Sequence, residues 1–357
     1  MEGHGAPELA GSRGEKKVAL LDLTYSQLHQ LLQSFGEPPY RTDQLYAWLY
    51  ASLAADFAGM HNLPRATRER LAQTADISTL TPLQEIVSPD GLTSKTLFGL
   101  SDGETIESVL MLYDERNTVC LSTQVGCPLG CLFCATGQSG FTRNLTTGEI
   151  IAQALHFARA LKEEERTITN VVFMGMGEPF LNYEATWQAI ETLADARGYN
   201  LGARRFTIST SGVVPGIERL TREKLQIGLA VSLHAADDDL RNNLVPLNRR
   251  YPLNELLEAC REYGKRTGRR VTFEYALAQG INDSMSQAGE LAGLLGGLLC
   301  HVNLIPLNPV PGSSWRASSV QRARTFHEEL GRLGINSTVR LRRGTEIEAG
   351  CGQLRSR

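Results

Sequence analysis

The chain has 357 residues, enough for one large α/β domain and a smaller accessory domain. Its formal net charge of −3 excludes a strongly basic protein, so bulk electrostatics do not indicate a nucleic-acid binder. No run of roughly 18 or more apolar residues predicts a membrane span, and seven irregularly spaced cysteines favour a reducing, cytoplasmic location over a disulfide scaffold.

The first 80 residues predict a tail followed by a small helical unit. Residues 1–17 are rich in Gly, Glu and basic side chains without an apolar signal segment, so we expect a disordered tail. In residues 18–80 apolar side chains recur at helical spacing, and Thr24 is a suitable N-cap. The predicted helices of this accessory domain are Tyr25–Gln33, Arg41–Ala54 and Arg65–Ala72.

Residues 81–114 change character and predict a small β-meander. The pairs Asp90-Gly91 and Asp102-Gly103 separate short strand-like runs at hairpin spacing. Glu107 is a carboxylate in an otherwise apolar strand, and by position alone it reads as an outward-facing residue.

Residues 115–357 alternate between strand and helix patterns. Six such units predict a parallel sheet, and six are too few to close an eight-stranded barrel. The predicted fold is therefore α/β, a partial (β/α)6 barrel with its sites at the carboxyl ends of the strands. The predicted strands are Val119–Val125, Asn170–Met174, Arg205–Ser209, Gly228–Leu233, Val271–Tyr275, Val302–Ile305 and Ser337–Leu341. The predicted helices are Thr147–Leu161, Tyr183–Ala194, Gly216–Leu220, Pro252–Thr267, Asp283–Leu295 and Gln321–Leu333.

Three cysteines follow the first of these strands at C-x3-C-x2-C spacing: Cys127, Cys131 and Cys134. Thiolates are soft ligands that bind zinc or iron–sulfur clusters. Three ligands on a four-iron cluster would leave one iron open to an outside molecule, which favours a catalytic cluster. A zinc knuckle with a distant fourth ligand, or buried structural thiols, is the alternative.

The spacing, with Phe133 before the third cysteine, resembles the signature of the radical S-adenosylmethionine (SAM) enzymes. The resemblance implies a [4Fe-4S] cluster whose open iron is chelated by SAM, and cleavage of SAM to a 5′-deoxyadenosyl radical. It also implies SAM-binding groups at the ends of successive strands. These are Gly177, Glu178, Ser209, Ser232, Leu233, His234 and Asn308. By themselves, a glycine-rich strand end and a lone histidine are more often ordinary structural residues.

From about Leu20 to Leu354 the chain resembles the bacterial adenine-C2 methyltransferases of 23S ribosomal RNA and tRNA. The resemblance implies both RNAs as substrates, an electron donor such as flavodoxin, a cytoplasmic monomer and an RNA-docking role for the N-terminal domain. The motifs that carry it are Gln124-Val-Gly-Cys-Pro-Leu-Gly-Cys-Leu-Phe-Cys, Gly140-Phe-Thr-Arg-Asn-Leu, Gly175-Met-Gly-Glu-Pro, Ser209-Thr-Ser-Gly-Val-Val-Pro and Ala349-Gly-Cys-Gly-Gln-Leu.

The same resemblance implies a mechanism with two SAM molecules per turnover. Cys351 matches the methyl carrier, which takes a methyl group from the first SAM. Cys120 matches the cysteine that releases the product by forming a disulfide with Cys351, and Glu107 matches the carboxylate that removes the C2 proton. From the sequence we also expect Arg342 and Arg343 to favour the Cys351 thiolate.

Two alternatives stay open at this point. A C8-methylating relative that confers antibiotic resistance shares the cluster and the terminal cysteine, although Asn303-Leu-Ile-Pro-Leu-Asn-Pro-Val-Pro-Gly looks more like the C2 group. A non-enzymatic zinc or cluster protein that only binds RNA would not need the glycine-rich motif around Cys351.

Overall fold

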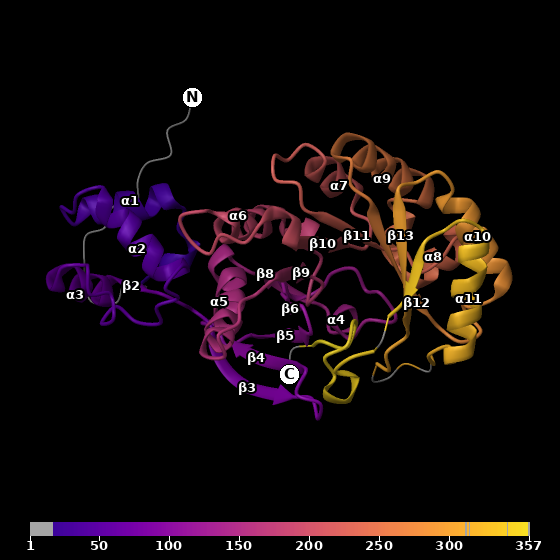
Figure 1. Ribbon diagram of the computed structural model, residues 1–357, viewed down its shortest axis with the longest axis horizontal. Coiled ribbons are helices and arrows are strands. Elements are labelled where there is room, and N and C mark those ends of the chain that lie inside the picture. Colours follow the sequence, from indigo (N-terminus) through magenta and orange to yellow (C-terminus); the bar gives the residue numbers. More distant parts are fainter. Residues whose placement is uncertain (1–16, 311–312, 314, 341, 356–357) are drawn as a thin grey trace.

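The structure, a computed structural model, describes residues 17–310, 313, 315–340 and 342–355. The expected tail, apart from Lys17, and Leu341 at the end of the last predicted strand lie outside the described residues. A helical domain lies at one end of the molecule and a large sheet with flanking helices fills the rest (Figure 1). No helix in the described residues is long and apolar enough to cross a membrane.

The N-terminal domain contains the three predicted helices between two short parallel strands, β1 (Val18–Ala19) and β2 (Ala75–Asp76). Thr24 caps the first helix in a capping box with Gln27, as its position predicts. Leucine side chains at helical spacing face the core. The helices are α1 (Tyr25–Ser34), α2 (Tyr40–Tyr50) and α3 (Arg65–Thr74), with a short 3-10 helix η1 (Leu20–Asp22) before them.

Helix α5 (Thr147–Glu163) carries many of the contacts of this domain with the rest of the chain, and the Tyr46 hydroxyl also donates to Asp195 Oδ2 at 3.3 Å. The Gly148 backbone N–H donates to Asp22 Oδ1 at 2.6 Å, and Arg159 Nε donates to the Leu53 carbonyl at 2.9 Å. These polar contacts and a shared hydrophobic core position the accessory domain next to the catalytic part of the chain.

The main sheet has ten strands in the order β14-β13-β12-β11-β10-β9-β6-β5-β4-β3. From β6 to β14 all neighbours are parallel, which confirms the predicted partial barrel. The parallel strands are β6 (Arg116–Cys120), β9 (Asn170–Phe173), β10 (Phe206–Thr210), β11 (Gly228–Ser232), β12 (Val271–Leu277), β13 (Cys300–Pro306) and β14 (Ser337–Val339).

The meander continues this sheet. Strands β3 (Thr81–Val87), β4 (Thr93–Gly99) and β5 (Thr105–Tyr113) are antiparallel, and β5 pairs with β6 at the start of the parallel region. Gly91 and Gly103 lie in the turns with φ of +70° and +89°, which explains the Asp-Gly pairs.

The crossover helices lie close to their predicted positions. They are α5, α6 (Tyr183–Ala194), α7 (Val214–Leu220), α9 (Leu253–Thr267), α10 (Met285–Leu295) and α11 (Val320–Arg332). The sequence analysis missed α8 (Asp238–Leu244), a short helix capped by the Asp237 side chain.

The single strand predicted at Val119–Val125 is wrong. The chain leaves the main sheet after Cys120 and re-forms a strand, β7 (Gln124–Gly126), that pairs with β8 (Phe141–Asn144) in a separate ribbon. Between the two strands Ser122 turns inward, where its N–H donates to Gln153 Oε1 at 2.8 Å. The apolar run Val119–Val125 therefore spans two strands that pair with different neighbours, and hydropathy alone does not show this change of pairing.

Alternation along the strands directs one set of side chains into the barrel and the other toward the helices. The inward set is unusually polar for a core and lines two cavities. Its members include Cys120, Met174, Thr207, Ser209, Ser232, Thr272, Glu274, Asn303, Ile305 and Arg340.

Candidate active site

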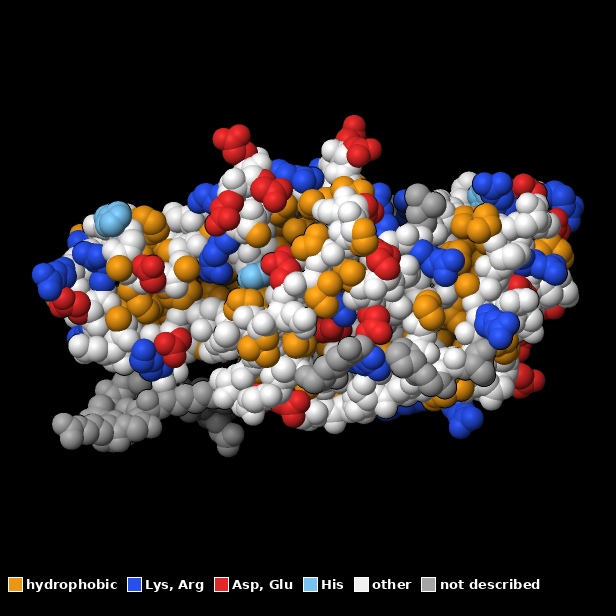
Figure 2. Space-filling view, turned by 90° about the horizontal axis from the view of Figure 1, so that it is seen from below, with side chains coloured by type: hydrophobic (Ala, Val, Ile, Leu, Met, Phe, Trp, Pro, Cys, Tyr) orange, Lys and Arg blue, Asp and Glu red, His pale blue; other side chains and the backbone are white. Residues whose placement is uncertain are grey.

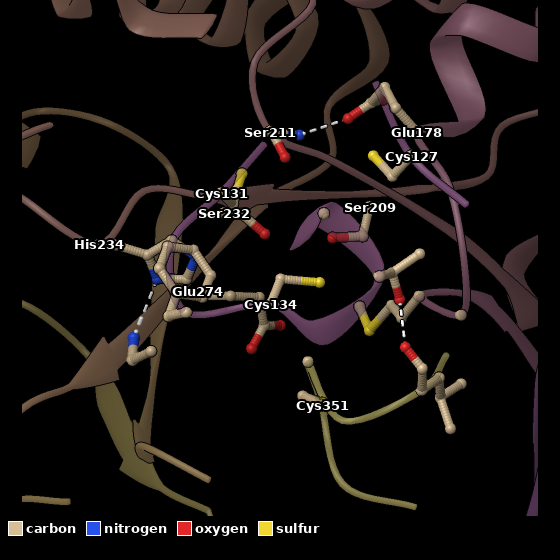
Figure 3. A pocket seen from close by; sticks show the side chains of 18 of the residues that line it. Cys127, Cys131, Cys134, Glu178, Ser209, Ser211, Ser232, His234, Glu274 and Cys351 are labelled. Atoms are coloured by element: carbon tan, nitrogen blue, oxygen red, sulfur yellow. Dashed lines mark hydrogen bonds between the residues drawn. The ribbon is translucent and has the colours of Figure 1, made fainter. Parts of the chain in front are cut away.

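The three clustered cysteines line a cavity at the carboxyl ends of the parallel strands, which we call the cysteine cavity (Figure 3). They lie in the loop between β7 and the short helix α4 (Ala135–Gln138). Gly126 starts this loop with φ of +74°, and a Cβ there would lie 2.0 Å from the Gly140 carbonyl oxygen. Only glycine therefore fits where the loop leaves the ribbon.

The donor set of this loop fits an iron–sulfur cluster. Cys127 and Cys131 are buried, and burial raises the pKa of the Cys127 thiol to about 12, so these thiols need a positive partner to ionise. All three cysteines line the same cavity. In the described residues no three His, Cys, Asp and Glu side chains surround a single metal ion, whereas each thiolate of a four-iron cluster binds a different iron.

Glu178 lies beside these cysteines at the end of the β9 strand. Its carboxylate accepts from the N–H of Ser211 at 2.8 Å and from that of Phe180 at 3.2 Å. Burial nevertheless raises its pKa to about 7, against the effect of these hydrogen bonds. Gly177, with φ of +102°, passes so close to Gln124 that a Cβ would lie 2.6 Å from its side chain. The carboxylate is therefore prepared to receive a cationic group.

His234 presents a neutral imidazole to the same cavity. Its Nδ1 accepts from the Ala276 N–H at 3.0 Å, which leaves the proton on Nε2. Burial, with a smaller effect of Arg241, lowers the pKa of His234 to about 3. Ser209 and Ser232 line the cavity as predicted, whereas the Leu233 side chain is fully buried and lies outside it.

The His234 pKa predicts an acid-dependent loss of stability. Because the folded-state pKa of His234 lies below the ordinary 6.5, its contribution to the free energy of unfolding is fully present above pH 6.5. This contribution is lost as the pH falls toward 3. Between pH 7.5 and pH 5 the loss is about 2 kcal/mol. Replacing His234 with Asn, which tolerates its φ of +63°, should remove this part of the difference in unfolding free energy. Urea titrations at both pH values measure the free energy of unfolding, and the same substitution at exposed His61 is the control. An unchanged pH dependence in His234→Asn would contradict the assignment.

Cys351 lies on the segment that closes the cavity from the C-terminal side, residues 348–355, which we call the carrier segment. Figure 3 shows it below Cys134. The Asn308 amide donates to the Cys351 carbonyl at 3.0 Å, and the Ala135 N–H donates to the Gly352 carbonyl at 2.7 Å. A Cβ on Gly350 would lie 2.6 Å from the Asn308 amide nitrogen. The glycines around Cys351 thus permit close packing of the segment on the barrel rim.

A second cavity lies deeper in the barrel and meets the first at Cys351. We call it the arginine cavity, because its lining includes Arg116, Arg270, Arg340, Arg342 and Arg343 together with Cys120. Burial raises the pKa of the Cys120 thiol to about 12, and the proximity of Cys351 adds to this effect. The structure therefore brings together two cysteines that are far apart in the sequence.

The cation next to Cys351 is Arg340. Cys351 is an exposed residue, but the protein atoms packed around its thiol raise the pKa of that thiol, and the Arg340 guanidinium opposes this effect. Arg343, which the sequence analysis had chosen with Arg342, donates instead to the Leu112 carbonyl at 2.8 Å. The sequence had indicated Arg342 and Arg343 for this position, but the cation that acts on Cys351 is Arg340, directly after the end of β14.

Glu107 is buried and does not line either cavity. Its carboxylate forms an ion pair with Lys95 at 2.8 Å and accepts from the Arg355 N–H at 2.9 Å. The positional expectation of an outward-facing residue was wrong, and the carrier segment covers the carboxylate.

Sequence reasoning also missed Glu274. It lines both cavities, accepts from the Asn303 amide at 2.9 Å and lies 3.7 Å from Arg340. Its Oε2 is buried without a hydrogen bond, and burial raises the pKa of the carboxyl group. Only the inward-facing position of Glu274, in a barrel lined by polar side chains, could have indicated that it belongs to the site.

The outer surface in Figure 2 mixes acidic and basic side chains without a large field of one sign. Positive charge is concentrated instead in the arginine cavity. There the Tyr113 ring lies between two guanidinium groups, 4.1 Å from that of Arg116 and 4.4 Å from that of Arg343. These contacts hold the Arg116 and Arg343 guanidinium groups against the Tyr113 ring.

Two family models match the chain. Residues 121–291 match the radical SAM superfamily, and residues 18–77 match the ribosomal RNA large subunit methyltransferase N-terminal domain. The chain is 52% identical over 349 residues to the probable dual-specificity RNA methyltransferase RlmN of Chloroflexus aurantiacus, covering 95% of this chain and 93% of the relative. It is 51% identical to the protein of the same name from Moorella thermoacetica, covering 95% and 97%.

A solved structure agrees. The chain is similar to the crystal structure of a radical SAM methyltransferase from Sphaerobacter thermophilus, with a TM-score of 0.93 and 55% identity over 95% of this chain and 99% of that one. Nearly the whole of both chains is therefore similar in fold.

Proposed function

This chain belongs to the RlmN family of dual-specificity RNA methyltransferases within the radical SAM superfamily, and from that premise we propose that it methylates C2 of an adenosine in 23S ribosomal RNA and in tRNA. The observation that carries the proposal is the position of Cys351, which lines both cavities. A methyl group on its sulfur is accessible from the cysteine cavity on one side and from the arginine cavity on the other.

A carrier is needed because C2 of adenine is an electron-poor, amidine-type carbon without a lone pair to attack a methyl group. In the proposed first step the Cys351 thiolate attacks the methyl carbon of SAM, forming a carbon–sulfur bond as the sulfonium–methyl bond breaks and S-adenosylhomocysteine leaves. Arg340 supports this step because its guanidinium favours the thiolate.

Cys127, Cys131 and Cys134 would hold the cluster, and Glu178 and His234 would bind a second SAM. When bound, cluster and SAM supply the radical chemistry that removes a hydrogen atom from the methyl group. Glu178 would accept hydrogen bonds from the ammonium group of this SAM, and the Nε2–H of His234 would donate a hydrogen bond to it. Ser209, Ser232, Asn308 and the Gly177 and Leu233 backbones complete the proposed binding set. An electron donor such as flavodoxin would reduce the cluster in the cytoplasm, with the protein acting as a monomer.

After the carrier carbon radical adds to C2, the adduct would lose the C2 proton and one electron, which the cluster would accept, and the RNA would remain attached to Cys351 by a thioether. In the proposed release, the Cys120 thiolate attacks Sγ of Cys351. A disulfide forms, the carbon–sulfur bond breaks, and its electron pair goes to the carbon, which takes up a proton. Glu107 takes the proton that leaves C2, and a thiol reductant restores Cys120 and Cys351. Cys120 and Cys351 both line the arginine cavity, which supports this pairing.

The arginine cavity would receive the target nucleotide and its flanking phosphates, with the N-terminal domain docking the RNA. We expect Arg116→Ala to raise KM for RNA about fivefold to tenfold with little change in kcat, because a phosphate contact is lost away from the chemistry. The slope of log KM against log salt should fall by about one unit. Methylation kinetics at several salt concentrations measure both, with exposed Arg324→Ala as the control. Equal KM values for the two variants would contradict this role.

Regiochemistry is tested by nucleoside mass spectrometry after anaerobic incubation with SAM, a reductant and unmodified ribosomal RNA or tRNA. We expect 2-methyladenosine from both RNAs. Formation of 8-methyladenosine would favour the C8-methylating relative and contradict the C2 assignment. The non-enzymatic hypothesis is set aside, because the family consists of methyltransferases.

A further inference from the structure

The carrier segment is held at both ends by one buried ion pair. Near its start, the Glu348 carbonyl accepts from Lys95 Nζ at 3.3 Å. Near its end, the Arg355 N–H donates to Glu107 Oε2 at 2.9 Å. Lys95 and Glu107 contact each other at 2.8 Å. The two ends of the segment are therefore joined through two side chains of the meander, and an ion pair between Arg355 and Glu348 at 3.5 Å also links them directly.

The register of the meander produces this pair. Lys95 on β4 is opposite Val109, and Glu107 on β5 is opposite Leu97, so the two charges are diagonal neighbours on one face. Their side chains are only 6% and 5% exposed. Charges this deeply buried require each other, since removing one partner leaves an uncompensated charge.

The middle of the carrier segment has separate attachments. Asn308 and Ala135 hold the carbonyls of Cys351 and Gly352, and the Thr136 hydroxyl donates to the Leu354 carbonyl at 2.5 Å. Release of the ends would therefore loosen the segment without removing Cys351 from the junction of the cavities.

We infer that Lys95 is a positioning residue that, together with Glu107, fastens the carrier segment in a closed position, and that the segment must leave Glu107 before this carboxylate can meet an RNA base. The inference rests on the proposed function for the roles of Glu107 and Cys351. It follows from the geometry, because Glu107 is 4% exposed and the Arg355 backbone occupies one of its oxygens.

The same geometry couples proton transfer to movement of the segment. When the C2–H bond breaks, its electron pair stays with the base and the proton goes to Glu107. The protonated carboxyl group carries no charge for Lys95 and offers fewer acceptor sites to the Arg355 N–H. Both ends then loosen together, and Cys351 gains the freedom to meet Cys120.

Hydrogen–deuterium exchange of the cluster-loaded protein without RNA tests this inference. We expect the peptide covering residues 344–355 to exchange about tenfold faster in Lys95→Met, because hydrogen bonds to charged groups are lost. Lys95→Arg, which keeps the charge, should restore most of the protection. The double variant Lys95→Met/Glu107→Gln removes both charges, so it tests the contacts without an unpaired buried charge. Lys17→Met, at an exposed ion pair with Asp76, is the control.

Exchange in helix α9, which is distant from the segment, should be unchanged in every variant. Unchanged exchange of residues 344–355 in both Lys95→Met and the double variant would overturn the inference. Faster exchange throughout the protein would also overturn it, since Lys95 would then be only a stability residue. The measurement needs neither RNA nor turnover, so its failure is distinguishable from a failure to detect methylated adenosine.

Discussion

A Cys120→Ala variant should become covalently attached to its RNA substrate. The proposed release requires a second thiol to attack the sulfur of Cys351, and Cys120 is the other cysteine that lines the arginine cavity. Without it, the thioether between Cys351 and C2 persists, and each enzyme molecule reacts at most once. Multiple turnover should fall by on the order of a thousandfold or more. Denaturing electrophoresis after anaerobic incubation with SAM, reductant and labelled RNA will reveal the attached species.

Two control variants sharpen this experiment. Cys260 is equally buried but lies on α9 outside both cavities, so Cys260→Ala should release its product. The double variant Cys120→Ala/Cys351→Ser should form no attached species, since it lacks the carrier sulfur. If Cys120→Ala turns over like the wild type, or if it stalls with free RNA, the assignment of Cys120 to product release is wrong.

A Cys351→Ser variant should lose RNA methylation altogether while it keeps its cluster. A hydroxyl group is far less nucleophilic than a thiolate, so it does not take a methyl group from SAM near neutral pH. Loss of a covalent nucleophile lowers the rate by on the order of ten-thousandfold or more. Nucleoside mass spectrometry measures the product, and iron and sulfide analysis verifies the cluster, whose three ligands lie elsewhere in the chain.

Mass spectrometry of the protein provides a second readout for this variant. In the wild type incubated with SAM, residues 344–355 should gain the mass of one methyl group, and in Cys351→Ser they should not. Methylated RNA from the serine variant would show that Cys351 is not the carrier. Loss of iron from that variant would show instead that Cys351 contributes to the cluster site.

Local patterns predicted much of this fold. The capping box at Thr24, the Asp-Gly turns of the meander and the strand–helix alternation each depend on residues close together in the sequence. Such signals survive without tertiary context, and the predicted ends of the crossover helices lie near the observed ones. The prediction failed at Val119–Val125, where the chain exchanges one strand partner for another while its hydropathy stays the same.

Some residues of the candidate site could also be predicted from short sequence patterns, whereas others could not. The spacing of Cys127, Cys131 and Cys134 and the motif around Cys351 identified the family, because each is a short contiguous pattern. Lys95, Glu274 and Arg340 have no such pattern. Lys95 and Glu274 lie in ordinary strands and Arg340 directly follows one, and the importance of each comes from which way its side chain faces and which distant residue lies near it.

The sequence by itself thus determined the class of chemistry, since ligand type and spacing set which cofactor a loop can hold. Only the tertiary structure decided which residues surround Cys351. Parallel pairing carries the strand ends to one rim, and the carrier segment folds back so that Cys351 lines the same cavity as Cys120, more than two hundred residues earlier in the sequence. The Lys95–Glu107 pair belongs to this second kind of information, because a buried charge acquires its meaning from the partner that the fold places beside it.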